Sequence, residues 1–410
     1  MKVRAITGFL DPGWPLVPER IASLAECLGA IRQALGDAGY ETQTLRLATP
    51  PPSRIDKPVP PSDRPEVAGQ LAAESLSHGI EYTNIGPALP DELDGFRVVP
   101  EVLAAAESVF CSGLYASVPS GLSLPAARAC AEAIQAASTV SPDGFANLRF
   151  AGLANVGPGS PFFPAAYHDD GPVSVALATE SADLAVESFQ NAGSQAAARR
   201  QLVGLIETHA AALTRAAEPV AAEHDVRFLG VDFSLAPYPE PNRSVGTALE
   251  LLGIPTLGLS GTAAAAAFLT DCLDQAKFTR TGFCGLMLPV LEDSILALRA
   301  AEGRLGLTEL LLMSTVCGCG LDTIPLPGEV NTESLAALLI DLGALALRHN
   351  KPLTSRLMPI PGKLAGDPIH FDFPYFADSR VIELPARPLT GLLASSGLLS
   401  LSARPLPRDS

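Results

Sequence analysis

One apolar run is followed closely by residues that could form a reactive site. Cys317 and Cys319 flank Gly318, and Gly320 and Asp322 come within three residues of Cys319. A thiol at a strand end can act as a nucleophile when its thiolate is favoured, and glycines let a ligand approach the backbone closely. The alternative is a pair of small residues that pack a tight turn. Structural zinc is not favoured, because it needs two more ligands and there is no second cysteine pair.

A loop rich in glycine and proline, residues 157–170, carries an imidazole beside a carboxylate. His168 and Asp169 lie near its end and are suited to acid/base chemistry or to metal binding. If a divalent ion is bound, we expect His168, Asp169 and Asp232 to be its ligands, although the residues do not identify the metal. The alternative is a rigid turn whose histidine caps a neighbouring element.

Two further acids follow predicted strands. Asp232, with Ser234 two residues later, comes at the end of an apolar run and is expected to project from the strand end. Its alternative role is to cap a helix or to accept hydrogen bonds from loop amides. Asp293 is typical of a helix N-cap, which leaves the adjacent Glu292 as the better candidate for proton transfer.

Two arginines are candidates for binding an anionic substrate, with Ser234, Gly318 and Gly320 as further substrate contacts. Arg243 precedes a predicted helix, whose free N–H groups would attract an anion; a simple N-cap by Asn242 or Ser244 is the alternative. Arg356 lies inside an apolar strand pattern, so its charge must be paired or must face a ligand.

The elements that position these residues alternate along the chain. Strands are predicted at 3–9, 40–47, 82–85, 108–113, 148–155, 173–178, 226–233, 285–290, 309–316 and 353–359. Helices are predicted at 18–38, 66–77, 98–106, 125–137, 196–223, 244–252, from 262, at 294–301 and at 332–348. This alternation predicts a single large α/β domain with a mostly parallel sheet, either an open doubly wound sheet or a closed β/α barrel. Ligands are then expected at the carboxyl ends of the strands.

Two segments depart from this alternation. Residues 50–65 are rich in proline and are predicted to be an ordered excursion or a hinge. Residues 363–410 are predicted to be a C-terminal extension of the domain. Residues 251–270 carry no charge, but their alanines and helix breakers favour a buried helix over a membrane span.

Composition narrows the range of partners and cofactors. The 410 residues carry a net charge of −16, which disfavours nucleic acid and anionic lipid as partners. Seven scattered cysteines and a start without an export signal predict a reduced, cytoplasmic setting. The sequence contains neither a P-loop nor a G-x-G-x-x-G motif, so it gives no indication of a nucleotide cofactor.

Four segments together resemble the DUF711 family, also called UPF0210: residues 43–51, 161–168, 232–237 and 317–328. The resemblance runs from Met1 to about Gly362. It implies a ten-stranded β/α barrel similar to those of pyruvate formate-lyase and ribonucleotide reductase. Radical enzymes of that fold carry a C-terminal glycine loop, whereas the nearest match here, Arg380 to Leu384, has no glycine. The resemblance therefore favours non-radical chemistry, and it also implies a small ACT-domain protein as a partner.

These observations predict an enzyme acting on a small carboxylate-bearing or amino-acid-like metabolite. The chemistry expected is acid/base or metal-assisted, at a rim where His168, Asp232, Glu292 and Cys317 converge. The alternative is a metabolite-binding regulator that works with an ACT-domain partner. A third interpretation is a homo-oligomer whose loops build interfaces, and a homo-oligomer is expected in any case. A closed pocket with a metal or paired acid/base groups favours the enzyme, and a shallow apolar patch favours the regulator.

Overall fold

The computed structural model describes residues 1–404 and is built around one large mixed sheet. The predicted C-terminal extension runs to residue 410, so its last six residues lie outside the described part. In spatial order the sheet holds β8 (Arg227–Ala236), β7 (Ser174–Glu180), β1 (Lys2–Phe9), β2 (Thr42–Ala48), β3 (Tyr82–Ala88), β4 (Val109–Ser117), β6 (Phe150–Ala154), β10 (Leu353–Ile360) and β9 (Gly320–Pro327).

The strands run in three groups. The central five, from β1 to β6 in the order above, are parallel. On one side β7 lies antiparallel to β1 and parallel to β8, and on the other β10 lies antiparallel to β6 and parallel to β9. Two short strands, β5 (Gly121–Ser123) and β13 (Leu398–Leu399), extend from β4. A separate hairpin joins β11 (Pro368–Ile369) to β12 (Ser379–Arg380). The mostly parallel sheet that the alternating pattern predicts is therefore present.

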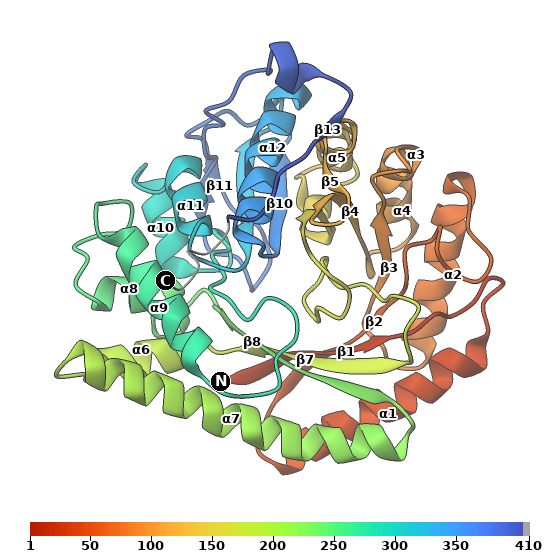
Figure 1. The fold of residues 1–410 in the computed structure, drawn as a ribbon, viewed down its shortest axis with the longest axis horizontal. Helices are drawn as coiled ribbons and strands as arrows, with labels where there is room; N and C mark the ends of the chain where they lie inside the picture. Colours follow the sequence, from red (N-terminus) through yellow and green to blue (C-terminus); the bar gives the residue numbers. More distant parts are fainter. Residues whose placement is uncertain (405–410) are drawn as a thin grey trace, which may run out of the picture.

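Figure 1 shows the helices around the outside of the curved sheet. They are α1 (Pro18–Asp37), α2 (Arg64–Ser77), α3 (Asp94–Arg97), α4 (Val99–Ala105), α5 (Leu124–Ala137), α6 (Ala182–Gln190), α7 (Gln195–Glu223), α8 (Val245–Leu251), α9 (Thr262–Gln275), α10 (Ser294–Ala301), α11 (Leu307–Ser314) and α12 (Thr332–His349). Local signals start several of them: Asp293 caps α10 and Ser244 caps α8, as expected for these positions. Within residues 1–404, no helix has the length and apolarity that a membrane crossing requires.

Two irregular segments cover the inner, concave face of the sheet. Apolar side chains of 156–167 and 283–287 pack there against small side chains of the strands, such as Ala5, Ala151 and Ala178. The second segment is part of a longer stretch, residues 280–290, called the linking segment because it joins the two edge strands. Arg280 forms a bridge with β8, and Pro289 forms one with β9. No regular strand of the described chain closes the sheet, so a closed barrel is not detected, and the pyruvate formate-lyase type of barrel remains a prediction.

Two predicted strands are wrong. Residues 309–316 lie mostly in helix α11, where the Glu309 carboxylate accepts a hydrogen bond from the Gly306 N–H at 3.0 Å. A short continuous apolar run does not distinguish strand from helix, and this capping interaction decides for the helix. Residues 285–290 form no strand and lie in the linking segment. The strand at this edge is instead β9, predicted as a loop; its prolines are tolerated because β9 is the last strand at this end of the sheet.

The proline-rich excursion at 50–65 is ordered by a small apolar cluster. Ile55 and Val59 are buried against Val67 of α2, and Trp14 packs on the same cluster. The segment ends in a short 3-10 helix, Pro61–Asp63, directly before α2. Its apolar side chains therefore pack against the start of α2.

Candidate functional site

A pocket with about 130 Å³ of free space opens on the concave face of the sheet. Strand side chains reach it from β1, β2, β3, β4, β6, β8, β9 and β10, and the irregular segments supply the remaining wall. The charged members are Arg4, Arg46, Glu292, Asp322 and Arg356. The aromatic members are Tyr82, Phe110, Phe162, Phe163, Phe283, Phe373 and Tyr375. Three arginines against two acids make this lining net positive in a chain of charge −16.

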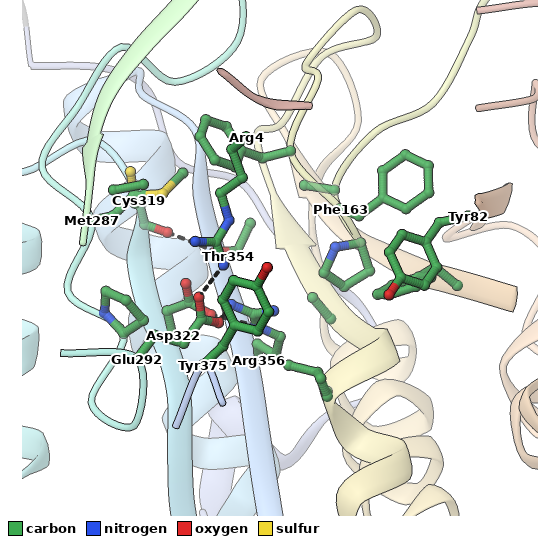
Figure 2. Close-up of a pocket in the computed structure, with 18 of the residues that line it drawn as sticks. Arg4, Tyr82, Phe163, Met287, Glu292, Cys319, Asp322, Thr354, Arg356 and Tyr375 are labelled. Carbon is green, nitrogen blue, oxygen red and sulfur yellow. Dashed lines mark hydrogen bonds and ion pairs between the residues drawn. The ribbon is translucent and has the colours of Figure 1, made fainter. Parts of the chain in front are cut away.

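Four of the charged side chains form a continuous chain of ion pairs. The Arg356 guanidinium donates to Asp322 Oδ1 at 2.5 Å and to Glu292 Oε1 at 2.6 Å. Arg4 donates to the other oxygen of Glu292 and, at 3.3 Å, to Glu180. Both oxygens of Glu292 are thus occupied. In residues 1–404, no hydrogen bond reaches Asp322 Oδ2, and this residue lines the pocket (Figure 2).

The surroundings push the pKa values of the two acids in opposite directions. Burial raises the pKa of Asp322, and the nearby negative charge of Glu292 raises it further; Arg356 only partly offsets both. Burial also raises the pKa of Glu292, but the charges of Arg356 and Arg4 outweigh it and hold that pKa below its usual value. The two neighbouring acids therefore differ: the pKa of Glu292 lies below its ordinary value and that of Asp322 lies above it.

The aromatic side chains lie on two sides of these charges. Tyr375 stacks near Arg4, with 5.7 Å between the guanidinium carbon and the ring centre, and it also packs against Tyr238. Figure 2 shows Tyr375 over the ion pairs and places Tyr82 and Phe163 on the opposite side of the pocket. Apolar walls of this kind keep water away from the charges and strengthen electrostatic interactions between them.

Comparison with known proteins settles the family. A family model described as "Uncharacterised ACR (DUF711)" matches residues 2–377. The chain belongs to the DUF711 family. A UPF0210 protein of Pyrobaculum islandicum is 31% identical over 399 residues, covering 90% of this chain and 87% of the relative. One from Pyrobaculum arsenaticum is 32% identical over 358 residues, covering 82% and 78%. One from Oleidesulfovibrio alaskensis is 29% identical over 378 residues, covering 87% and 82%.

Membership of DUF711 confirms the family resemblance that the four sequence segments indicated. The names of these relatives state no activity, so the function has to be inferred from the pocket. Four of the predicted site residues meet there: Glu292, Cys319, Asp322 and Arg356. Arg243 lies just outside, paired with Glu180, whose carboxylate also receives Arg4. Arg243 therefore holds a neighbouring carboxylate instead of facing the pocket.

Asp232 and Ser234 are buried behind the pocket wall. The Asp232 carboxylate accepts hydrogen bonds from the N–H groups of Phe283 at 2.7 Å and Cys284 at 2.9 Å, and from the Ser234 hydroxyl at 2.6 Å. Ser234 Oγ accepts in turn from the Gly285 N–H at 3.1 Å. The alternative of an acid that satisfies loop amides is the one observed: Asp232 and Ser234 hold the linking segment against β8.

His168 and Asp169 do not join this group. His168 lines a different cleft, with Asp11 and His224, and its imidazole Nδ1 lies 3.7 Å from Asp169 Oδ1. The predicted common rim of His168, Asp232, Glu292 and Cys317 is therefore wrong: of these four residues only Glu292 lines the pocket. The expected rim required each residue to follow a strand, whereas no strand precedes Glu292 or Cys317 directly and Asp232 lies within β8. Across the described chain, no three His, Cys, Asp or Glu side chains are grouped so that they could hold a metal ion, and this includes the predicted set of His168, Asp169 and Asp232.

The cysteine loop differs from its expected role. Cys319 lines the pocket, but burial raises the pKa of its thiol well above the usual value, which disfavours the nucleophilic thiolate. Cys317 is buried outside the pocket lining, and its carbonyl oxygen accepts a hydrogen bond from Lys351. Gly318 packs on Gly285, and Gly320 packs on the backbone of Thr354, so both glycines make room for neighbouring backbone and not for a ligand.

Sequence reasoning missed Arg4, Arg46 and Tyr82, because it searched at the carboxyl ends of strands. These residues lie near the amino ends of β1 and β3 and within β2, on the central five strands. The flanking pairs of strands run the opposite way, so the pocket combines amino ends of the centre with the carboxyl end of β8. The signal that found Arg356, a charge inside an apolar strand, was also present at Val3-Arg4-Ala5 and Leu45-Arg46-Leu47.

Proposed function

We propose that this DUF711 protein is an enzyme that transfers a proton to or from a small carboxylate-bearing metabolite bound in the pocket. Asp322 is the acid/base group. Glu292 and Arg356 are positioning residues. Arg356 holds Asp322 through an ion pair, and Glu292, whose two oxygens are both occupied, raises the pKa of Asp322 through its charge.

The observation that carries this proposal is the unequal pair of acids. Glu292 is bonded through both oxygens and stays ionised, whereas Asp322 keeps one oxygen toward the pocket and has a raised pKa. A carboxyl group with a raised pKa takes up and returns a proton at a higher pH than an exposed aspartate does. The net positive lining supports an anionic substrate, and a carboxylate is the simplest small anion that also fits apolar walls.

Proton transfer at a carbon atom can be tested by hydrogen–deuterium exchange of the substrate. In D₂O, a base that removes a proton from the carbon next to a carboxylate exchanges that proton for deuterium, which ¹H NMR detects without knowledge of the final product. We expect the protein to catalyse exchange in at least one member of a panel of 2-hydroxy acids, 2-amino acids and arylacetates. The rate should rise with pH through the pKa of Asp322, above the ordinary value of 3.8, because the ionised form is the base.

Asp322→Asn keeps the shape of the side chain but removes the base, and we expect it to slow the exchange about a hundredfold or more. Asp94→Asn, at an exposed position on the other side of the sheet, is the matched control and should leave the rate unchanged. Equal exchange by Asp322→Asn and the wild-type protein, at equal melting temperatures, would refute the proposal.

A further inference from the structure

Arg46 differs from the other arginines of the pocket in its partners. Arg4 and Arg356 are both paired with carboxylates. Arg46 makes no ion pair with any residue in 1–404, and its one hydrogen bond joins Nε to the Thr44 hydroxyl oxygen at 2.9 Å. Its two terminal nitrogens, with four N–H groups, have no protein acceptor in that range, and the side chain is half-buried at the pocket.

Aromatic rings surround this guanidinium. Its central carbon lies 5.2 Å from the centre of the Phe163 ring and 5.8 Å from that of Tyr82, and Phe110 packs edge-on against both rings. Burial lowers the pKa of Arg46 to about 10, and the charge of Arg4 adds to the effect. The group is still protonated at neutral pH. The guanidinium therefore carries a charge that faces the pocket without a counter-ion from the chain, which leaves it available to a partner from outside.

The geometry of the free groups restricts that partner. A guanidinium presents parallel N–H groups that match the two oxygens of a carboxylate. No second unpaired cation of the described chain lines the pocket beside Arg46, so a dianion such as phosphate would be left only partly neutralised. The rings and the apolar members Leu148, Ala151 and Pro164 line the space around it.

We propose that Arg46 binds the carboxylate of a ligand with an apolar, preferably aromatic, body, and so determines the substrate class of the site. The inference rests on the proposed function, because it names the substrate class of that site. Its test is independent of catalysis, because binding is measured without turnover. Tyr82, Phe110 and Phe163 contact the apolar body, and the bound carboxylate neutralises Arg46.

The test is isothermal titration with three probes: phenylacetate, its neutral analogue phenylacetamide, and inorganic phosphate. We expect phenylacetate to bind and the other two to bind at least about tenfold more weakly. Arg46→Met, which keeps the apolar stem but removes the charge, should weaken phenylacetate binding about tenfold or more. Arg97→Met removes an exposed arginine and is the matched control, with unchanged binding.

A second readout separates a ligand-binding role from a structural one. If Arg46 serves the ligand, Arg46→Met should raise the melting temperature of the unliganded protein by about 2 °C, because a half-buried charge without a counter-ion in the chain is removed. Arg46→Lys keeps the positive charge but lacks the parallel N–H groups of the guanidinium. This variant should fold as the wild type does and still bind phenylacetate more weakly. This variant keeps the proposal testable if the methionine variant does not fold.

Several results would overturn the inference: undiminished phenylacetate binding by folded Arg46→Met or Arg46→Lys, phosphate binding as tight as that of phenylacetate, or binding of none of the probes. These outcomes are separate from failure of the proposed function. Binding that depends on Arg46 in a protein without proton exchange would leave the anion site intact and refute Asp322 as the base.

Discussion

Three arginines reach one pocket from β1, β2 and β10, and their different surroundings give them different roles. Arg4 and Arg356 hold Glu292 between them, so their charges are balanced within the chain. Arg46 lies among aromatic rings without such a balance in residues 1–404. At the scale of single residues, the partners of a charge therefore separate a structural arginine from one that is available to a ligand.

His168 offers a residue-scale test of pH dependence. Burial lowers the pKa of its imidazole below the ordinary value of 6.5, with Asp169 and Asp11 opposing the shift. The unfolded chain therefore binds a proton at a higher pH than the folded chain, so the stability contributed by neutral His168 is lost as pH falls below 6.5. Urea unfolding at pH 7.5 and pH 5.5 should show a larger loss in the wild type than in His168→Gln. Equal losses would contradict the assigned pKa direction.

At the scale of elements, close backbone contacts hold the pocket wall in place. The linking segment between β8 and β9 places Phe283 and Met287 in the pocket wall. Its Gly285 packs directly on Gly318 of the cysteine loop. A Cβ atom built on Gly285 would lie 2.6 Å from Gly318 Cα, which is backbone and cannot rotate away. These glycines are thus needed for the close approach of two chain segments.

Gly285→Ala should accordingly lower the free energy of unfolding by about 1 to 3 kcal/mol, because the two segments must separate to admit the methyl group. Gly204→Ala is a suitable control, since no atom lies within 4 Å of a Cβ at this exposed position of α7. It should stabilise the protein by up to about 1 kcal/mol through helix propensity. Chemical denaturation measures both, and a neutral Gly285→Ala would show that the contact is looser than the structure places it.

At the scale of the whole molecule, the site exists because the sheet curves and one segment joins its two edges. Glu292 follows this segment, and Asp322 lies on the edge strand that the segment meets at Pro289. Asp232 fixes the other end of the segment through the N–H groups of Phe283 and Cys284. The position of the acids therefore depends on an anchor at the far edge of the sheet.

Asp232→Asn should weaken this connection. Both carboxylate oxygens of Asp232 accept a hydrogen bond from a backbone N–H, and the amide nitrogen of asparagine cannot accept one. We expect a loss of about 3 kcal/mol in the free energy of unfolding and faster hydrogen exchange at residues 279–290. Asp94→Asn, exposed and distant, again serves as the comparison. Mass spectrometry of peptic fragments resolves the segment, and unchanged exchange there would contradict the anchoring role.

The sequence by itself determined most elements of this protein and four residues of its pocket. Periodic helices such as α1 and α12, and buried strands such as β10, follow from local patterns that act over a few residues. The family also followed from sequence segments alone. Arg356 was found because a charge inside an apolar strand needs a partner. Glu292 was found because it lies beside an N-cap without being one, and Asp322 because it follows two cysteines in a glycine-rich stretch.

The tertiary structure alone decided which charges meet. Arg4 and Glu292 are 288 residues apart, and no local pattern relates them. The reversed direction of the flanking strands moved the pocket to the amino ends of the central strands and placed His168 in another cleft. Contacts between distant segments depend on strand order and direction, which arise from packing of the whole sheet, and so the pairing of Arg4 and the isolation of Arg46 became visible only in the folded molecule.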